Sequence, residues 1–132
     1  MRYVLMMHVP RGQSEYQHTS WAPDRWRAHM EYWHQMNAGL EASGEYVAVE
    51  ALTSPSEARL VRAGAEGMPA VTDGPFAESK EFLAGYWIVD VDSLERACEI
   101  AAHASAAPGP DGAPLRMPIE VRQVMGSPVA DM

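Results

Sequence analysis

The sequence predicts an α+β fold, because short strand patterns alternate with two helical patterns along the chain. Residues 2–9 and 86–91 are apolar on both alternating faces, which is typical of strands at the centre of a covered sheet. Residues 24–42 carry large apolar side chains at helical spacing, and a second helical pattern begins at residue 92. The resulting order of strand, helix, strand, hairpin, strand, helix, strand is the ferredoxin-like βαββαβ order with an extra short hairpin.

The first helix is expected to begin at Asp24 and to end at Ala42. Pro23 fits the first helical turn, and Asp24 favours the positive end of the helix dipole. Gly44 suits the left-handed conformation that caps a helix at its C-terminus. The predicted apolar face of this helix contains Trp26, Met30, Trp33, either Met36 or Asn37, and Leu40.

The middle of the chain predicts a strand followed by a short hairpin. Residues 46–52 are strand-like, and residues 53–56 form a turn that contains serine and proline. Residues 58–63 and 68–72 form the expected hairpin, joined by Gly-Ala-Glu-Gly at 64–67. We expect this hairpin as an addition to the four main strands.

The second helix is predicted to start at Asp92, because Glu95 follows three residues later in the spacing of a capping box. Cys98 is interpreted as an inert core thiol, since no base is evident beside it. The stretch 108–114, rich in proline and glycine, ends this helix, and residues 117–125 form the last predicted strand. The apolar side of the helix is expected to contain Leu94, Ala97, Cys98 and Ala101.

Composition and charge favour a single globular domain, which we place at residues 1–126, with residues 127–132 as a frayed tail. The 132-residue chain has 18 acidic and 10 basic residues, giving a net charge of −8. This excess of acid argues against a surface for nucleic acid or anionic membranes, because both need basic patches. No apolar run reaches the ~18 residues of a membrane-spanning helix, and a single cysteine excludes an internal disulfide. We therefore expect a soluble cytoplasmic protein.

A polar loop within residues 71–86 lies between two strand patterns, and the rest of the chain is organised around it. The loop begins with Asp73-Gly-Pro-Phe76, which favours a turn, and continues as Ala-Glu-Ser-Lys-Glu. This run resembles the signature of the DGPF branch of the YCII-related family. Residues 2–7, 85–101 and 119–122 resemble, in that order, the family's opening strand, its third core strand with the second helix, and its last strand.

The resemblance implies a dimeric α/β barrel of ferredoxin-like subunits, with a site that includes an aspartate and often a histidine. It also implies an association with sigma-factor-type transcription regulators. The residues predict a homodimer independently, because two helices cover only one face of a four-stranded sheet. Residues 2–9 and 86–91 are apolar on both faces, and packing against a second copy buries the other face.

Two residues are candidates for acid–base catalysis. Asp73 can act as a general acid or base, but a turn aspartate that accepts backbone N–H bonds explains it as well, and the tripeptide alone favours the turn role. The resemblance strengthens the catalytic interpretation. His8, at the end of an apolar strand, can relay protons near neutral pH, or it can be a hydrogen-bonded structural histidine. The sequence favours neither role for His8.

Four further residues are candidates for substrate binding. Lys80 and Glu81 can bind a polar group, although a solvated loop with local ion pairs also explains them. Arg122, on the polar side of the last strand, can hold a carboxylate in a bidentate pair or can pair with an acid across the sheet. His34 is included because the YCII branch carries a helical histidine in its proposed site.

No metal or organic cofactor is expected from the sequence. His29 and His34 are five residues apart, about 140° around a helix, so they cannot chelate one ion together. The sequence also contains no glycine loop for phosphate, no histidine–cysteine cluster at metal spacing and no dinucleotide fingerprint.

Two functions remain open from the sequence. The first is a dimeric, cofactor-independent enzyme or binder of a small polar or aromatic metabolite. In this function Asp73 and His8 transfer protons in an isomerase-, lyase- or hydrolase-like reaction. The alternative is a non-catalytic accessory or regulatory protein linked to transcription regulation, with the loop from Asp73 to Glu81 as scaffold or contact surface. An enclosed polar pocket favours the first function, and an exposed contact patch favours the second.

Overall fold

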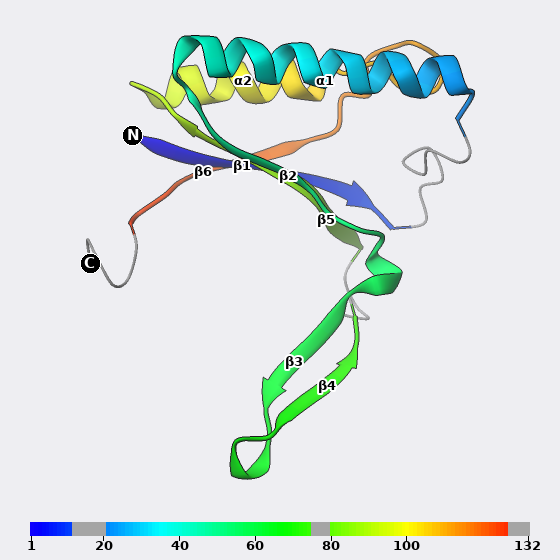
Figure 1. The fold of residues 1–132 in the computed structure, drawn as a ribbon, viewed down its shortest axis with the longest axis vertical. Helices are drawn as coiled ribbons and strands as arrows, with labels where there is room; N and C mark the ends of the chain where they lie inside the picture. Colours follow the sequence, from blue (N-terminus) through cyan, green and yellow to red (C-terminus); the bar gives the residue numbers. More distant parts are fainter. Residues whose placement is uncertain (12–20, 75–79, 127–132) are drawn as a thin grey trace.

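The computed structural model describes residues 1–11, 21–74 and 80–126. Its centre is a four-stranded antiparallel sheet that carries two helices on one face (Figure 1). The elements in chain order are β1 (Arg2–Pro10), α1 (Pro23–Ser43), β2 (Tyr46–Ala51), η3 (Pro55–Glu57), β3 (Arg59–Ala63), η4 (Ala65–Gly67), β4 (Pro69–Asp73), β5 (Glu81–Asp90), α2 (Leu94–Ser105) and β6 (Ile119–Gln123).

The strand order confirms the predicted α+β arrangement. The sheet runs β2-β5-β1-β6, and every neighbouring pair is antiparallel. With the β3–β4 hairpin set aside, the element order is βαββαβ, as predicted. The described strands of one chain do not close into a barrel, so β2 and β6 remain as edge strands.

Two strand predictions were wrong at their ends. The strand predicted at 86–91 begins earlier, because β1 is long enough to pair with β5 as far as Pro10 opposite Glu81. The last strand is shorter than 117–125, because its ladder with β1 covers only residues 119–123.

Two predictions for the second helix were also wrong. Ser93, not Asp92, caps α2, since the Ser93 hydroxyl accepts a hydrogen bond from the Arg96 backbone N–H at 3.1 Å. Cys98 is exposed rather than in the core. The buried stripe of α2 instead consists of Ala97, Ile100, Ala101 and Ala104.

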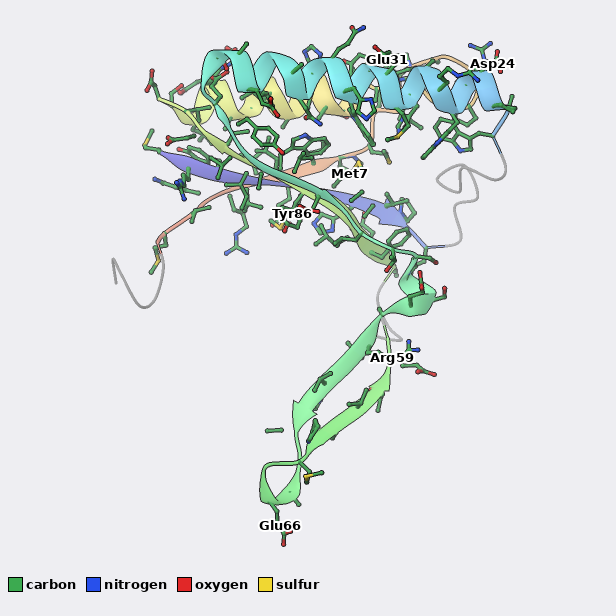
Figure 2. The ribbon with its side chains drawn as sticks, in the orientation of Figure 1. Met7, Asp24, Glu31, Arg59, Glu66 and Tyr86 are labelled. Carbon is green, nitrogen blue, oxygen red and sulfur yellow. The ribbon has the colours of Figure 1, made fainter. Side chains whose placement is uncertain are left out.

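The hydrophobic core lies between the sheet and the two helices. Alternate residues of β1 are buried against the helices, and the residues between them are only half-buried on the other face. Figure 2 shows Met7 on the helix side of the sheet and Tyr86 on the opposite side. The Trp87 indole N–H donates to the Asn37 side-chain oxygen at 2.9 Å and fixes α1 on the sheet. The buried side chains of the sheet include Tyr3, Leu5, Met7, Val9, Trp87 and Val89.

The β3–β4 hairpin forms an arm that projects away from the body of the molecule (Figure 1). Its two strands make a separate sheet with Val61 opposite Val71. Three large apolar side chains of the arm are exposed, namely Val61, Met68 and Val71. A two-stranded ribbon has little independent stability in water, so the arm is the least supported part of the described fold.

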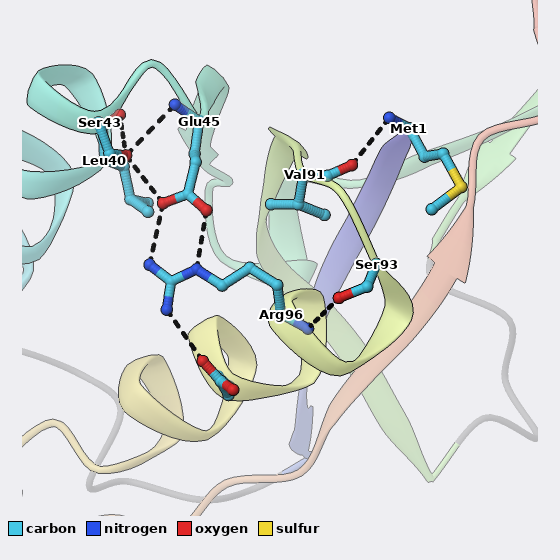
Figure 3. A network of polar contacts seen from close by, with 8 residues as sticks. Met1, Leu40, Ser43, Glu45, Val91, Ser93 and Arg96 are labelled. Atoms are coloured by element: carbon cyan, nitrogen blue, oxygen red, sulfur yellow. Dashed lines mark hydrogen bonds and ion pairs between the residues drawn. The ribbon is translucent and has the colours of Figure 1, made fainter.

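An ion pair joins α2 to the short connection between α1 and β2 (Figure 3). The Arg96 guanidinium on α2 donates to both carboxylate oxygens of Glu45, at 2.7 and 2.9 Å. Glu45 lies between α1 and β2, and the Ser43 hydroxyl also donates to it at 2.8 Å. Hydrogen bonding from Arg96 lowers the pKa of Glu45 to about 2, against an opposing effect of burial.

We predict that Glu45→Gln lowers the free energy of unfolding at pH 7 by about 1–2 kcal/mol, a value limited by the partial exposure of Arg96. A lowered pKa contributes stability above the pKa of the unfolded chain, so this difference should shrink as pH falls from about 4.5 towards 2. Chemical denaturation at pH 7 and pH 3 measures it, with the exposed Glu41→Gln as the matched control. A difference that does not change with pH would contradict the role of this carboxylate.

His29 on α1 is fully buried, although the sequence analysis used it only to argue against a metal pair. Its Nδ1–H donates to the Pro108 carbonyl at 3.0 Å. Its ring lies 4.9, 5.2 and 4.2 Å from the ring centroids of Trp21, Trp26 and Trp33. In the described part of the chain Nε2 has no hydrogen-bond partner. Burial therefore lowers the pKa of His29, and the bond to Pro108 opposes this only partly.

Because the fold favours neutral His29, its contribution to stability should be present above pH 6.5 and lost as pH falls below that value. The His29→Phe variant keeps an aromatic ring among the tryptophans but cannot take up a proton. Its stability should therefore decrease less than that of the wild type between pH 7.5 and 5.5, as measured by urea denaturation. His34→Gln, which changes an exposed histidine of the same helix, should follow the wild type. Equal pH dependence in wild type and His29→Phe would rule out this source of instability.

Candidate functional site

A hollow of about 770 Å³ lies between the end of β1, the start of β5 and the segment that follows β2. Its lining is mostly apolar, with one imidazole, one ammonium and one carboxylate among the side chains. The size suits a small molecule, since ligand pockets usually have volumes of about 300–1,000 Å³. The lining residues are His8, Leu52, Thr53, Ser54, Pro55, Ala58, Lys80, Glu81, Phe82 and Leu83.

A β-bulge shapes this hollow. Met7 pairs with Gly85, but the next residue, His8, pairs with Leu83, so Ala84 is an extra residue in β5. Its carbonyl accepts a hydrogen bond from the Leu52 backbone N–H at 2.8 Å. The bulge therefore anchors the segment after β2 beside His8, in keeping with the frequent position of bulges next to functional sites.

Gly85 allows β2 and β5 to approach each other next to the bulge. A Cβ atom at this position would lie 2.8 Å from the Glu50 carbonyl oxygen and 3.4 Å from the Ala51 Cα. Both are backbone atoms of β2 and cannot rotate away. The glycine is therefore required by close backbone packing rather than by an unusual φ angle.

His8 lies on the sheet face opposite the helices and contacts Glu120 of β6. Its Nε2 is 3.0 Å from the Glu120 Oε1 atom. An ionised carboxylate only accepts hydrogen bonds, so this contact requires a proton on Nε2, and in the neutral ring Nδ1 keeps a lone pair. The two side chains are 30% and 50% exposed, which leaves the imidazole accessible from the hollow.

This arrangement has the parts of an acid–base pair. A carboxylate that accepts from one ring nitrogen fixes the tautomer and stabilises the positive charge when the other nitrogen takes up a proton. Here Glu120 supplies that carboxylate and Nδ1 of His8 is the basic atom. The geometry supports proton transfer to or from a molecule in the hollow.

Lys80 and Glu81 add charge to the hollow at the start of β5. The Lys80 carbonyl accepts a hydrogen bond from the Arg11 backbone N–H at 2.9 Å, which fixes the main chain beside His8. Among the described residues, no acidic side chain pairs with the Lys80 ammonium. Lys80 can therefore bind an anionic or carbonyl oxygen of a ligand.

Three predicted site residues lie elsewhere. Asp73, at the end of the arm, is not in the lining; its side chain is 91% exposed, and Oδ1 is 3.6 Å from the Arg59 Nε atom. Arg122 is exposed on the open face of β6, opposite Val4. His34 is exposed on α1 and does not line the hollow. The predicted Asp73–His8 pair is therefore not formed within the described chain, and residues 75–79 of the predicted loop lie outside the described residues.

Glu120 is the residue that the sequence analysis missed. It lies on the same face of β6 as Arg122. The sequence does not show which strand pairs with β6. The register with β1, Met6 opposite Glu120, brings this carboxylate to His8.

Two kinds of feature are absent from the described residues. No group of three or more histidine, cysteine, aspartate or glutamate side chains with the geometry to hold a metal ion occurs in residues 1–11, 21–74 and 80–126. None of the helices in these ranges is long and apolar enough to cross a membrane.

Comparison with known proteins identifies a family and one relative. The sequence profile of the YCII-related domain matches residues 1–109, which is most of the chain. An uncharacterized protein of Rhizobium meliloti (strain 1021) is 40% identical over 53 residues. That alignment covers 40% of this chain and 43% of the relative, so the chain spans less than half the length of this relative.

We predict that Gly85→Ala lowers the free energy of unfolding by about 1–3 kcal/mol, because the added methyl group meets backbone atoms of β2. It should also displace the segment after β2 and shift the NMR signals of Leu52 and His8. Gly39→Ala on α1 is the matched control, since its Cβ meets nothing within 4 Å and alanine favours a helix. If Gly85→Ala is as stable as Gly39→Ala, close packing does not explain this glycine.

Proposed function

The chain belongs to the YCII-related family, and we propose that it binds a small metabolite in the hollow and exchanges a proton with it through His8. The observation that carries this proposal is the His8–Glu120 contact of 3.0 Å beside a mostly apolar hollow. Lys80 supplies a cation for a carboxylate or a carbonyl oxygen at the same place. The ligand is therefore a small molecule with an apolar or aromatic body and one anionic group.

The proposed step is proton abstraction next to a carbonyl group. His8 Nδ1 takes the proton from the carbon atom, and the electron pair of the broken C–H bond moves onto the carbonyl oxygen as an enolate. Lys80 stabilises the negative oxygen, and Glu120 stabilises the imidazolium. The imidazolium then returns the proton to carbon or oxygen, so the step needs no further reactant. This places the reaction with isomerases.

The DGPF branch and the homodimer are part of the same proposal. The run Asp73-Gly-Pro-Phe76 supports assignment to that branch of the family. The second face of the sheet supports a dimeric α/β barrel, because apolar side chains on it are only half-buried in one chain. Such side chains include Val4, Met6, Tyr86 and Ile88.

The exposed apolar arm supports the alternative of a non-catalytic accessory or regulatory protein. Val61, Met68 and Val71 are more than half exposed and suit a protein contact. The two functions differ in what a substitution on the arm does. A contact protein should lose its partner when Val61 and Val71 become polar, whereas ligand binding beside His8 should be unaffected.

The binding part of the proposal is tested by NMR titration with benzoate, phenylacetate, phenylpyruvate and hexanoate. We expect at least one of them to shift the signals of His8 and Phe82, and we expect Lys80→Ala to weaken binding at least tenfold. His34→Gln should bind like the wild type. If no probe shifts the NMR signals of residues that line the hollow, or if Lys80→Ala binds as well as the wild type, this hollow is not the binding site.

The catalytic part is tested by exchange of the phenylpyruvate methylene protons with D₂O. The wild type should accelerate exchange, and His8→Gln should lower the acceleration by about 10²-fold or more, the usual contribution of a general base. Glu120→Gln should lower it less, because the imidazole remains. Equal exchange rates for wild type and His8→Gln would leave a binding protein without this chemistry.

A further inference from the structure

The open face of the sheet has a charge pattern that sequence alternation alone did not reveal. Residues that pair directly across an antiparallel ladder share one face. Arg122 lies opposite Val4, and Glu120 lies opposite Met6. On the other side of β1, Ile88 lies opposite Val4 and Tyr86 lies opposite Met6. One face therefore carries an apolar centre with charged side chains beside it.

Arg122 and Glu120, which carry opposite charges, lie two residues apart on this face of β6. Arg2 and Arg122 lie towards the end where β1 begins, where Asp90 lies opposite Arg2. Glu120 is two residues before Arg122 on β6 and lies nearer the end of β1. Glu50 of β2, which pairs with Tyr86, lies at the same level of the sheet. In the part of the chain that the structure describes, no acidic side chain pairs with either arginine.

This pattern is self-complementary for a second copy of the chain. A two-fold axis that lies between two such faces and crosses β6 near Val121 reverses the strand direction of the partner. It places Arg122 of each subunit opposite Glu120 of the other, because Val121, on the axis, lies midway between the two residues. Residues two positions apart are about 6.6 Å apart along a strand. The same operation places Val4 opposite Met6 of the partner subunit. Arginine and glutamate side chains are long enough to meet between sheets that pack about 10 Å apart.

The net charge of the chain makes this local match important. Each copy carries a net charge of −8, so opposite charges that meet at an interface reduce the repulsion between two copies. Arg122 provides the cation that meets Glu120 under this symmetry.

We propose that Arg122 of the partner subunit contacts Glu120 and completes the site beside His8. This inference rests on the proposed function, and it assigns to Arg122 a positioning role rather than a catalytic one. The partner's guanidinium holds the Glu120 carboxylate in contact with His8. It also offsets the negative charge of Glu120, so that an anionic ligand can approach Lys80.

Charge reversal on the two positions tests the contact in the full-length protein. The variants Arg122→Glu and Glu120→Arg each place two pairs of like charges across the proposed interface, so each should raise the dimer dissociation constant at least tenfold. An equimolar mixture restores opposite charges at both contacts, and it should form heterodimers with near wild-type affinity. Sedimentation velocity and native mass spectrometry measure this. Arg27→Glu, on the exposed surface of α1, is the matched control and should leave the wild-type assembly unchanged.

Three outcomes would overturn the inference: a monomeric wild type, dimers of Arg122→Glu as tight as the wild type, or no heterodimer in the mixture. Phenylpyruvate binding then tests the effect on the site. Arg122→Glu alone should bind it at least tenfold more weakly, and the mixture should regain about one site per heterodimer, in the subunit that keeps Glu120. Restored heterodimers without restored binding would refute the role at the site. Failure of phenylpyruvate to bind the wild type would refute the proposed ligand chemistry while the assembly result stands.

Discussion

The register of β1 between β5 and β6 determines most of the structure. In this register Leu5 and Met7 point towards the helices and form part of the core, whereas Met6 and His8 lie on the other face. The same register brings Glu120 next to His8, although the two residues are 112 positions apart in sequence. A shift of one residue along either ladder would exchange the faces and remove both the core and the site.

The bulge at Ala84 adds the second element of the site. It interrupts the regular ladder beside His8 and offers a carbonyl to Leu52, so the chain after β2 forms one wall of the hollow. Gly85 then lets β2 approach β5 at this point. The wall of the hollow therefore depends on two consecutive residues of β5, Ala84 and Gly85.

The sequence predicted the parts of the fold that follow local rules. The helix over residues 24–42 and its Gly44 cap follow from apolar spacing and backbone preference, and the structure confirms both. The sequence analysis was wrong where two neighbouring residues could both cap a helix. Ser93 replaced Asp92 as the helix cap because its hydroxyl reaches the Arg96 N–H.

Some residues of the hollow were predicted from local sequence, and those that depend on strand pairing were not. His8, Lys80 and Glu81 were recognised as polar residues near strand ends, and the fold brings them to one hollow. Asp73 was chosen for its place in the motif, but the arm carries it away from the lining. Glu120 was missed because only the pairing of β6 with β1 makes it a neighbour of His8. Long-range strand pairing is not encoded in the periodicity of a single segment.

The most direct test of the account is the tautomer of His8 in neutral solution, measured by long-range ¹H–¹⁵N NMR. We expect the proton on Nε2 in the wild type, held there by Glu120, and a mixture of tautomers in Glu120→Ala. A proton on Nδ1 in the wild type, or the same spectrum in both proteins, would contradict the assignment of Nδ1 as the basic atom of His8. The proposed proton transfer through His8 would then have no structural basis.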